Sequence, residues 1–228
     1  MERFQAILLE LCEGFGNTVL LFAITLLFAL PLGLLFAFGS MSKFKPLQWF
    51  MKVLIWVIRG TPLMLQILLV SFIPNYVFHV QTKELAAALH LSINATMFFF
   101  VAVAFVINYA CYFSEIYRAG IETIPVGQYE AGKVLGLTKN QVFSKIVLMQ
   151  VVRRILPPMS NEIITLVKDT SLAQILGVID LLNAAKHAVN HYVILTPFLY
   201  AAVFYLIFNG LLTLLLGWAE KKLSYYKV

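Results

Sequence analysis

The sequence predicts an all-α integral membrane protein with five transmembrane helices. Hydrophobic residues make up 61% of its 228 residues and charged residues only 12%, whereas soluble domains are roughly 45–50% apolar. The mean hydropathy is +0.87. Apolar runs recur along the chain, each close to the ~20 residues that a helix needs to cross ~30 Å of hydrocarbon. Because the sequence shows no internal repeat, residues 1–228 are predicted to form one transmembrane domain.

The first part of the chain is predicted to hold two spans. Residues 1–15 mix glutamates with apolar residues at helical spacing, which predicts a helix lying along the membrane surface. The first span follows over about 16–39, where Pro31 allows a bend. Residues 47–58 form an amphipathic lead-in to a second span over about 63–78.

Three more spans are predicted after a polar connection. The third covers about 95–117, and residues 121–154 carry too many charges to enter lipid. That segment must therefore face solvent or dock on a partner. The fourth span, about 156–179, is predicted to begin at a pair of prolines. The fifth span covers about 196–218.

Basic residues are distributed unevenly between the two sides that five spans define. Thirteen Lys and Arg residues fall in the loop after the first span, in the segment between the third and fourth spans, and in the C-terminal tail, which includes Lys227; three fall on the other side. Cytoplasmic loops retain positive charge. This asymmetry predicts an outside N-terminus and a cytoplasmic C-terminus, and it accounts for the net charge of +6 without a nucleic-acid-binding face.

No catalytic or metal-binding motif is found in the sequence. It has no GxxxxGK[ST] loop, no HExxH and no GxSxG. The one cluster that combines a nucleophile with a base is Lys168, Asp169 and Ser171, whose nearly contiguous positions on a helix point in different directions. The residues alone leave three alternatives to a transport subunit: a channel, a secondary transporter and an intramembrane enzyme.

Residues 127–149 resemble the EAA loop of ABC importer permeases. The family pattern is Glu, Ala, Ala, three residues, Gly, nine residues, Ile, any residue, Leu, Pro. The residues that match it at the same spacing are Glu130, Ala131, Gly136, Ile146 and Leu148. Gly132 stands in place of the second Ala and Met149 in place of the Pro.

Three further stretches resemble the polar amino acid branch of these permeases. Residues 59–63 (Arg-Gly-Thr-Pro-Leu) resemble the segment that opens the second span, and residues 111–118 resemble an Ala-Tyr-x-x-Glu-Ile-x-Arg stretch in which Cys111 departs. Asn161 and Glu162, followed by residues 168–172 (Lys-Asp-Thr-Ser-Leu), resemble a fourth element. The four matches occur in the right order over about 59–178, and together they are specific.

The resemblance implies a type I ABC importer permease in a bacterial-type cell membrane. Its implied partners are a second permease subunit, cytoplasmic ABC ATPase subunits and an extracytoplasmic amino-acid-binding protein. ATP and Mg²⁺ would be bound by the partner ATPase, so this chain is expected to need no cofactor and to carry no catalytic residue. Homodimer or heterodimer stays open, as do a substrate site within this chain and the substrate, which could be a basic, neutral polar or acidic amino acid or cystine.

The segment over about 121–154 is the expected contact with the ATPase. Its apolar residues are spaced for short amphipathic helices that break at Gly136, which can take the positive φ that such a turn needs. A short helix of this kind is marginal in water and gains stability from a partner groove. The expected coupling residues are Glu130, Ala131, Gly132, Gly136 and Leu137.

Polar residues within the spans are the candidates for the substrate pathway. Glu162 and Asp169 lie within about 20° of each other on the fourth span, and Asp169 is the one nearer the midplane. Lys168 points about 100° away and is expected to form a structural ion pair. Glu115 either contacts substrate or pairs with Arg118. Groups that could bind an α-amino or α-carboxylate group, or else join helices, are Asn108, Tyr109, Tyr112, Thr170 and Ser171.

Overall fold

The computed structural model describes residues 2–223, which form helices and no strand. Lys227, counted above in the C-terminal tail, lies outside the described residues. The elements are α1 Glu2–Ser40, α2 Lys45–Arg59, α3 Leu63–Phe78, α4 Thr82–Ala88, α5 Ile93–Glu122, α6 Val126–Val134, α7 Lys139–Val142, the π-helix η1 Phe143–Val147, α8 Leu148–Asp169, the 3-10 helix η2 Thr170–Leu176, α9 Leu181–Tyr192 and α10 Thr196–Leu223.

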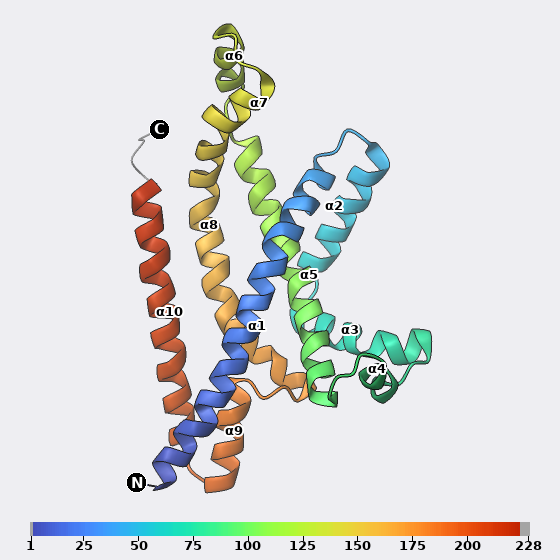
Figure 1. Cartoon of the computed structure of the whole chain (residues 1–228), viewed down its shortest axis with the longest axis vertical. Helices are drawn as coiled ribbons and strands as arrows, with labels where there is room; N and C mark the ends of the chain where they lie inside the picture. Colours follow the sequence, from blue (N-terminus) through green and yellow to red (C-terminus); the bar gives the residue numbers. More distant parts are fainter. Residues whose placement is uncertain (1, 224–228) are drawn as a thin grey trace.

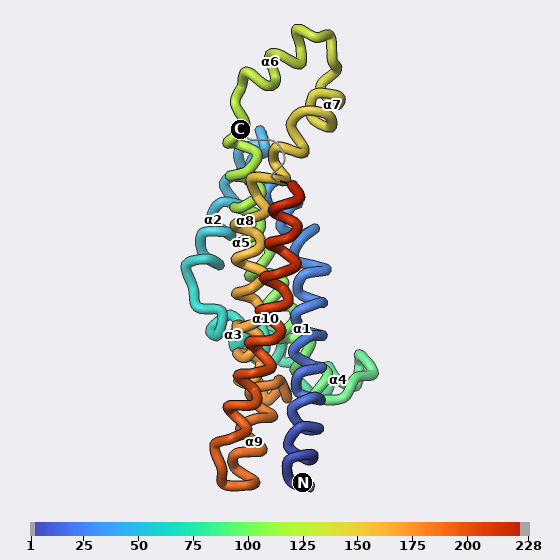
Figure 2. The backbone as a smooth tube through the Cα atoms, turned by 90° about the vertical axis from the view of Figure 1, so that its left-hand side faces the viewer, coloured from blue at the N-terminus to red at the C-terminus, as the bar shows by residue number. Residues whose placement is uncertain are grey.

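The helices α1, α2, α5, α8 and α10 run along the long axis of the molecule (Figure 1). The α6 and α7 helices extend beyond one end of this bundle, and α9 lies at the other end beside the start of α1 (Figure 2). By length and composition α1, α5 and α10 can each cross a membrane, and a fourth span results if α2 and α3 are counted as one broken helix. The fold class is therefore as predicted, while composition alone does not establish the count of five.

α5 is the centre of the bundle and α10 its periphery. In the apolar window of α5, 61% of residues are buried, against 6% in α10. Phe105, Tyr109 and Phe113 of α5 are almost completely buried among residues of the neighbouring helices. α1 approaches α5 closely at Gly33, where an added Cβ would lie 2.9 Å from the carbonyl oxygen of Ala110. Small residues allow such contact between membrane helices.

The prediction of a separate surface helix over residues 1–15 is wrong. α1 is one helix of 39 residues, and Pro31 lies inside it. Ile7 and Leu11 are buried in a cluster with Leu181 and Ala184 of α9. The apolar stripe that predicted burial in a membrane surface is covered by another part of the chain instead.

The second span also differs from its prediction. α2 runs along the bundle, and α3, which covers the predicted span, turns away from it at 111°. The bend occurs at residues 60–62, and the Gln66 side chain holds it by donating hydrogen bonds to the carbonyl oxygens of Ile58 (2.7 Å) and Thr61 (3.0 Å). The amphipathic lead-in is thus the longitudinal part of this hairpin.

The fourth span begins earlier than predicted. α8 starts at Leu148, so Pro157 and Pro158 lie inside the helix rather than at its start. Neighbouring helices can satisfy the backbone groups that an internal proline frees. The helix extends upstream because Val147 and Val151 are buried in a cluster with Ile124 and other residues of the 121–155 region.

Candidate functional site

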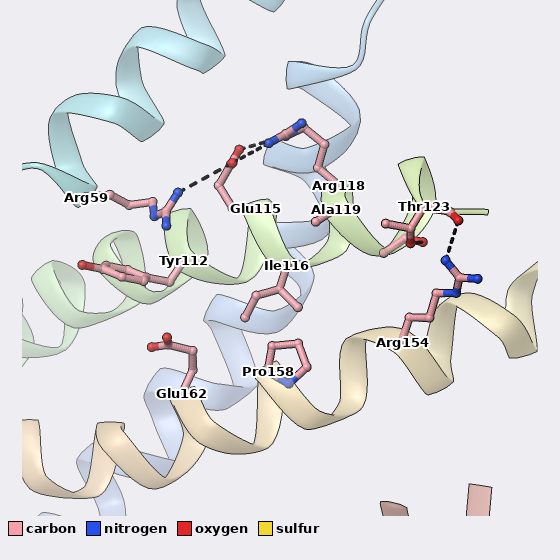
Figure 3. Close-up of a pocket in the computed structure, with 11 residues that line it drawn as sticks. Arg59, Tyr112, Glu115, Ile116, Arg118, Ala119, Thr123, Arg154, Pro158 and Glu162 are labelled. Atoms are coloured by element: carbon pink, nitrogen blue, oxygen red, sulfur yellow. Dashed lines mark hydrogen bonds and ion pairs between the residues drawn. The ribbon is translucent and has the colours of Figure 1, made fainter. Parts of the chain in front are cut away.

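A charged cavity of about 640 Å³ lies between α2, α5 and α8 (Figure 3). It extends along α5 to Gly120 and Thr123, at the end of α5 that leads into α6. Its lining residues are Arg59, Tyr112, Glu115, Ile116, Arg118, Ala119, Gly120, Thr123, Arg154, Pro158 and Glu162. Three arginines and two glutamates therefore meet in one space, a set suited to the ends of a polar, zwitterionic molecule.

Glu115 is the hub of the ion pairs in this cavity. Its carboxylate accepts hydrogen bonds from Arg118 Nη2 at 2.7 Å and Nε at 3.1 Å, which is the pairing that the sequence left open. Arg59 Nη1 approaches the same carboxylate at 3.6 Å, and the Arg59 guanidinium stands 5.2 Å from the centre of the Tyr112 ring. This second arginine, from the end of α2, joins the bend of the α2–α3 pair to α5.

Sequence reasoning ranked Glu162 below Asp169 and did not propose Arg59 or Arg154 for the site. Glu162 points into the cavity from α8 (Figure 3) and forms no ion pair within residues 2–223. Arg154 Nη1 donates to the carbonyl oxygen of Thr123, the residue that ends α5. The signal for Arg59 was its place in a matched stretch, but its approach to Glu115 depends on how α2 packs against α5.

Asp169 does not line this cavity; it is the last residue of α8, two turns of helix beyond Glu162. Its Oδ2 accepts a hydrogen bond of 2.7 Å from the buried Tyr109 hydroxyl. Tyr109 and Tyr112 are neighbours on α5, with ring centres 6.4 Å apart. The predicted stripe of Glu162 and Asp169 thus faces two successive tyrosines of α5.

Lys168 is exposed, and within residues 2–223 it makes no ion pair. The predicted structural ion pair of this lysine is therefore not formed inside the described chain. A pairing with the facing subunit stays a prediction.

The other pathway candidates bond to the chain itself. Asn108 Nδ2 donates to Gln66 Oε1 at 2.9 Å, and both side chains are buried. Thr170, fully buried, donates to the carbonyl oxygen of Val167 at 2.6 Å. Ser171 donates to the carbonyl oxygen of Lys168 at 2.8 Å. Asn108 thereby joins α3 to α5, one of the two roles the sequence allowed.

The coupling segment folds as the predicted pair of short helices. α6 ends in a Schellman motif: the Gly136 N–H bonds to the Lys133 carbonyl (2.9 Å) and the Leu137 N–H to the Gly132 carbonyl (3.0 Å). Gly136 has φ +72°, so its predicted positive φ is confirmed. Glu130 is exposed at the surface of α6.

Gly132 has a packing reason to replace the alanine of the family pattern. It is buried, and an added Cβ would lie 2.5 Å from Cγ2 of Val142. Leu137 packs against the same cluster. In contrast, Ala131 is exposed, and Val134 and Leu135 expose 87% and 74% of their surface. One face of the segment is thus packed, and the other is apolar and uncovered.

Comparison with known proteins agrees with this geometry. Residues 29–225 match the family described as "Binding-protein-dependent transport system inner membrane component". The chain is 35% identical to the L-cystine transport system permease protein TcyB of Bacillus subtilis (95% of this chain, 87% of the relative). It is 31% identical to the arginine transport system permease protein ArtQ of the same organism (93% and 91%).

A solved structure shares the fold of this chain. The crystal structure of an amino acid ABC transporter with histidines superposes with a TM-score of 0.78 at 27% identity, over 93% of this chain and 94% of the other. The resemblance drawn from the EAA loop and the three further stretches is confirmed. This chain belongs to the family of binding-protein-dependent transport system inner membrane components, the permease subunits of ABC importers.

Proposed function

We propose that this chain forms the substrate pathway of an ATP-driven importer of polar amino acids together with a second permease subunit. The observation that carries the proposal is the exposed apolar face at the end of α6, which Val134 and the C-cap residue Leu135 form. The α6 helix extends beyond the end of the bundle (Figure 2). Such a short helix is marginal in water and is stabilised in a partner groove. The partner is a cytoplasmic ABC ATPase, which binds ATP and Mg²⁺.

Contacts at the base of the coupling segment support its role in transmitting motion. Arg154 of α8 donates to the Thr123 carbonyl at the end of α5, so the two helices that carry the segment are joined where it begins. Glu130, Ala131, Gly132, Gly136 and Leu137 are the proposed coupling residues. The buried Gly132 and half-buried Leu137 fix α6 on α7, while Glu130 and Ala131 face outward. A rigid unit of this kind would transmit closure of the ATPases to α5 and α8.

The charged cavity, together with the carboxylate of Asp169 farther along α8, supports polar amino acids as the transported class. Arg59, Glu115 and Glu162 offer both signs of charge to an α-carboxylate and an α-amino group. Asp169, Asn108, Tyr112, Thr170 and Ser171 are proposed as further pathway residues. Asp169, Asn108, Thr170 and Ser171 each form a side-chain hydrogen bond within the chain in this conformation, so they contact substrate only if those bonds are exchanged. TcyB is named for cystine and ArtQ for arginine, and both of these amino acids belong to the proposed class.

The remaining assembly follows from the family. We expect an extracytoplasmic amino-acid-binding protein to deliver substrate at the end that carries α9, and the N-terminus to lie outside the cell membrane with the C-terminus inside. Cysteine labelling on a cysteine-free background tests this orientation, because Lys83 and Lys139 are both exposed. Position 83 should react with an impermeant reagent from outside and position 139 only after permeabilisation. The reverse pattern would contradict the topology.

Purification of the tagged chain from native membranes tests the function. A cassette ATPase should copurify, and proteoliposomes holding the complex and its binding protein should accumulate amino acids only when ATP is enclosed on the ATPase side. A panel of cationic, neutral polar and acidic amino acids and cystine identifies the substrate. Uptake driven by an ion gradient without any ATPase would instead indicate a secondary transporter.

A further inference from the structure

A second polar crevice lies between α8 and α10. These two helices run side by side, and the crevice residues of α10 lie in its last turn (Figure 1). Its volume is about 300 Å³, at the lower end of small-ligand pockets. It is lined by Arg153, Leu156, Pro157, Glu220, Lys221 and Leu223. None of these residues lines the charged cavity, and none is one of the coupling residues proposed above.

This crevice opens at the level of a membrane–water interface. α10 is the least buried of the apolar helices, and its Leu214, Leu215 and Trp218 expose most of their side chains outward. The Lys222 ammonium stands 5.0 Å from the centre of the Trp218 ring. A tryptophan followed by lysines marks the headgroup region of a bilayer. The apolar part of α10 therefore faces acyl chains, and the crevice faces headgroups.

Arg153 distinguishes this crevice from an ordinary basic helix end. Of the five arginines in the chain, four pair with an oxygen of the chain itself: Arg3, Arg59, Arg118 and Arg154. Within residues 2–223, Arg153 has no such partner, although it is partly buried and lines the crevice beside Lys221. Its five N–H donors are arranged as a fork that matches phosphate oxygens.

We propose that the crevice binds the headgroup of an anionic phospholipid. Arg153 contacts two phosphate oxygens through its fork, and Lys221 adds a second positive charge. Leu156, Pro157 and Leu223 pack against the glycerol and the first acyl carbons. Glu220 accepts a hydrogen bond from a headgroup hydroxyl, which favours a phosphatidylglycerol-type lipid. Basic pockets between membrane helices bind anionic headgroups through the same chemistry.

The lipid would also hold α10 against the bundle. α10 contributes few buried residues to the core, so a headgroup that bridges Arg153 on α8 and Lys221 on α10 would strengthen the attachment of α10 to α8. α8 carries both Glu162 and Asp169. The crevice thus connects lipid composition to the helix that lines the proposed pathway.

Native mass spectrometry of the intact complex, released from nanodiscs, tests the proposal. The nanodiscs contain phosphatidylcholine with phosphatidylglycerol or with phosphatidylethanolamine. The wild-type chain should retain phosphatidylglycerol, and the double variant Arg153→Gln, Lys221→Gln should retain about tenfold less, because it loses the charge-assisted hydrogen bonds to the phosphate. The matched control is Lys43→Gln, Lys45→Gln, which removes two charges near the α1–α2 turn, outside the crevice, and should retain lipid like the wild type.

Several results would overturn the assignment. Equal retention by the double variant and the wild type, or equal loss in the control, would show that interfacial charge alone holds the lipid. Equal retention of phosphatidylethanolamine would refute the anionic class, and displacement by inorganic phosphate would indicate a soluble anion site. Arg153→Lys keeps the charge without the fork, so it should lose about threefold; wild-type retention by this variant would refute the bidentate contact even if the double variant failed to fold.

Discussion

Replacing Gly136 separates backbone strain from steric clash in the coupling segment. Gly136 has φ +72°, and an added Cβ would meet no atom within 4 Å. Any cost of a side chain here therefore comes from the left-handed backbone, which is about 1–2 kcal/mol for an ordinary L-residue. Asn tolerates this conformation better than Ala, and β-branched Val worst of all. The expected loss of the folded α6–α7 unit rises in the order Asn, Ala, Val.

Copurification of the ATPase with each variant measures how much of the folded α6–α7 unit is lost. A cost of 1–2 kcal/mol is roughly a five- to thirtyfold shift in the folded population, so Gly136→Val should lower ATPase copurification or uncouple hydrolysis from uptake. Insertion should be normal, because α6 lies outside the apolar spans. Gly127→Ala is the matched control: Gly127 lies in the first turn of the same helix, also in open space, but without a positive φ. It should bind the ATPase like the wild type.

Two outcomes would refute the reasoning about Gly136. If Gly136→Val kept full transport and normal copurification, this segment would not be the coupling contact. If Asn, Ala and Val at position 136 were equally damaging, the cause would be a contact with the ATPase rather than the backbone conformation of α6.

Three further predictions follow from other sites. Gly132→Ala should destabilise the α6–α7 contact by about 1–3 kcal/mol through overpacking and so lower ATPase copurification. Adding Val142→Ala to the same chain should restore copurification, because it removes the side chain that an alanine at position 132 would approach to 2.5 Å. Failure of this rescue would contradict the clash. The Asp169→Asn variant should insert normally and still bind the ATPase, but its uptake should be lower than that of Tyr109→Phe. Tyr109→Phe removes the same hydrogen bond but keeps the carboxylate. Unchanged uptake kinetics in Asp169→Asn would exclude Asp169 from the pathway. Burial raises the pKa of Asp180, in the connection before α9, to about 6, so its protonated form is favoured on folding. The free energy of unfolding should therefore fall by about 3 kcal/mol as pH rises from about 4 through 6. In the Asp180→Asn variant, the midpoint temperature of thermal unfolding should depend less on pH over that range. An equal pH dependence of the midpoint in the variant and the wild type would contradict this.

Local features of the coupling segment could be predicted from the sequence. The break at Gly136 and its positive φ depend on residues that are near neighbours in the chain, and the Schellman bonds that satisfy the helix end span five residues or fewer. The packing of Gly132 against Val142 could not be predicted, because it requires the α6–α7 turn to fold back on itself.

Errors in the predicted helix starts have one physical cause. The periodicity of residues 1–15 correctly indicated an apolar helical face, but a membrane surface and α9 would bury that face equally well. The same ambiguity affected α8, whose first turns are covered by a cluster that includes Ile124. Periodicity identifies which residues are buried, and only the tertiary structure identifies what buries them.

The sequence by itself determined the membrane class, the family and the position of the coupling segment, because hydropathy and motif spacing are properties of neighbouring residues. Only the tertiary structure decided how the site is assembled. The contacts of Arg59 with Glu115 and of Tyr109 with Asp169 join residues on different helices. They form because α2 and α8 both pack against α5 around the charged cavity (Figure 3). Such packing depends on the shapes of whole helix surfaces rather than on the order of residues along one helix.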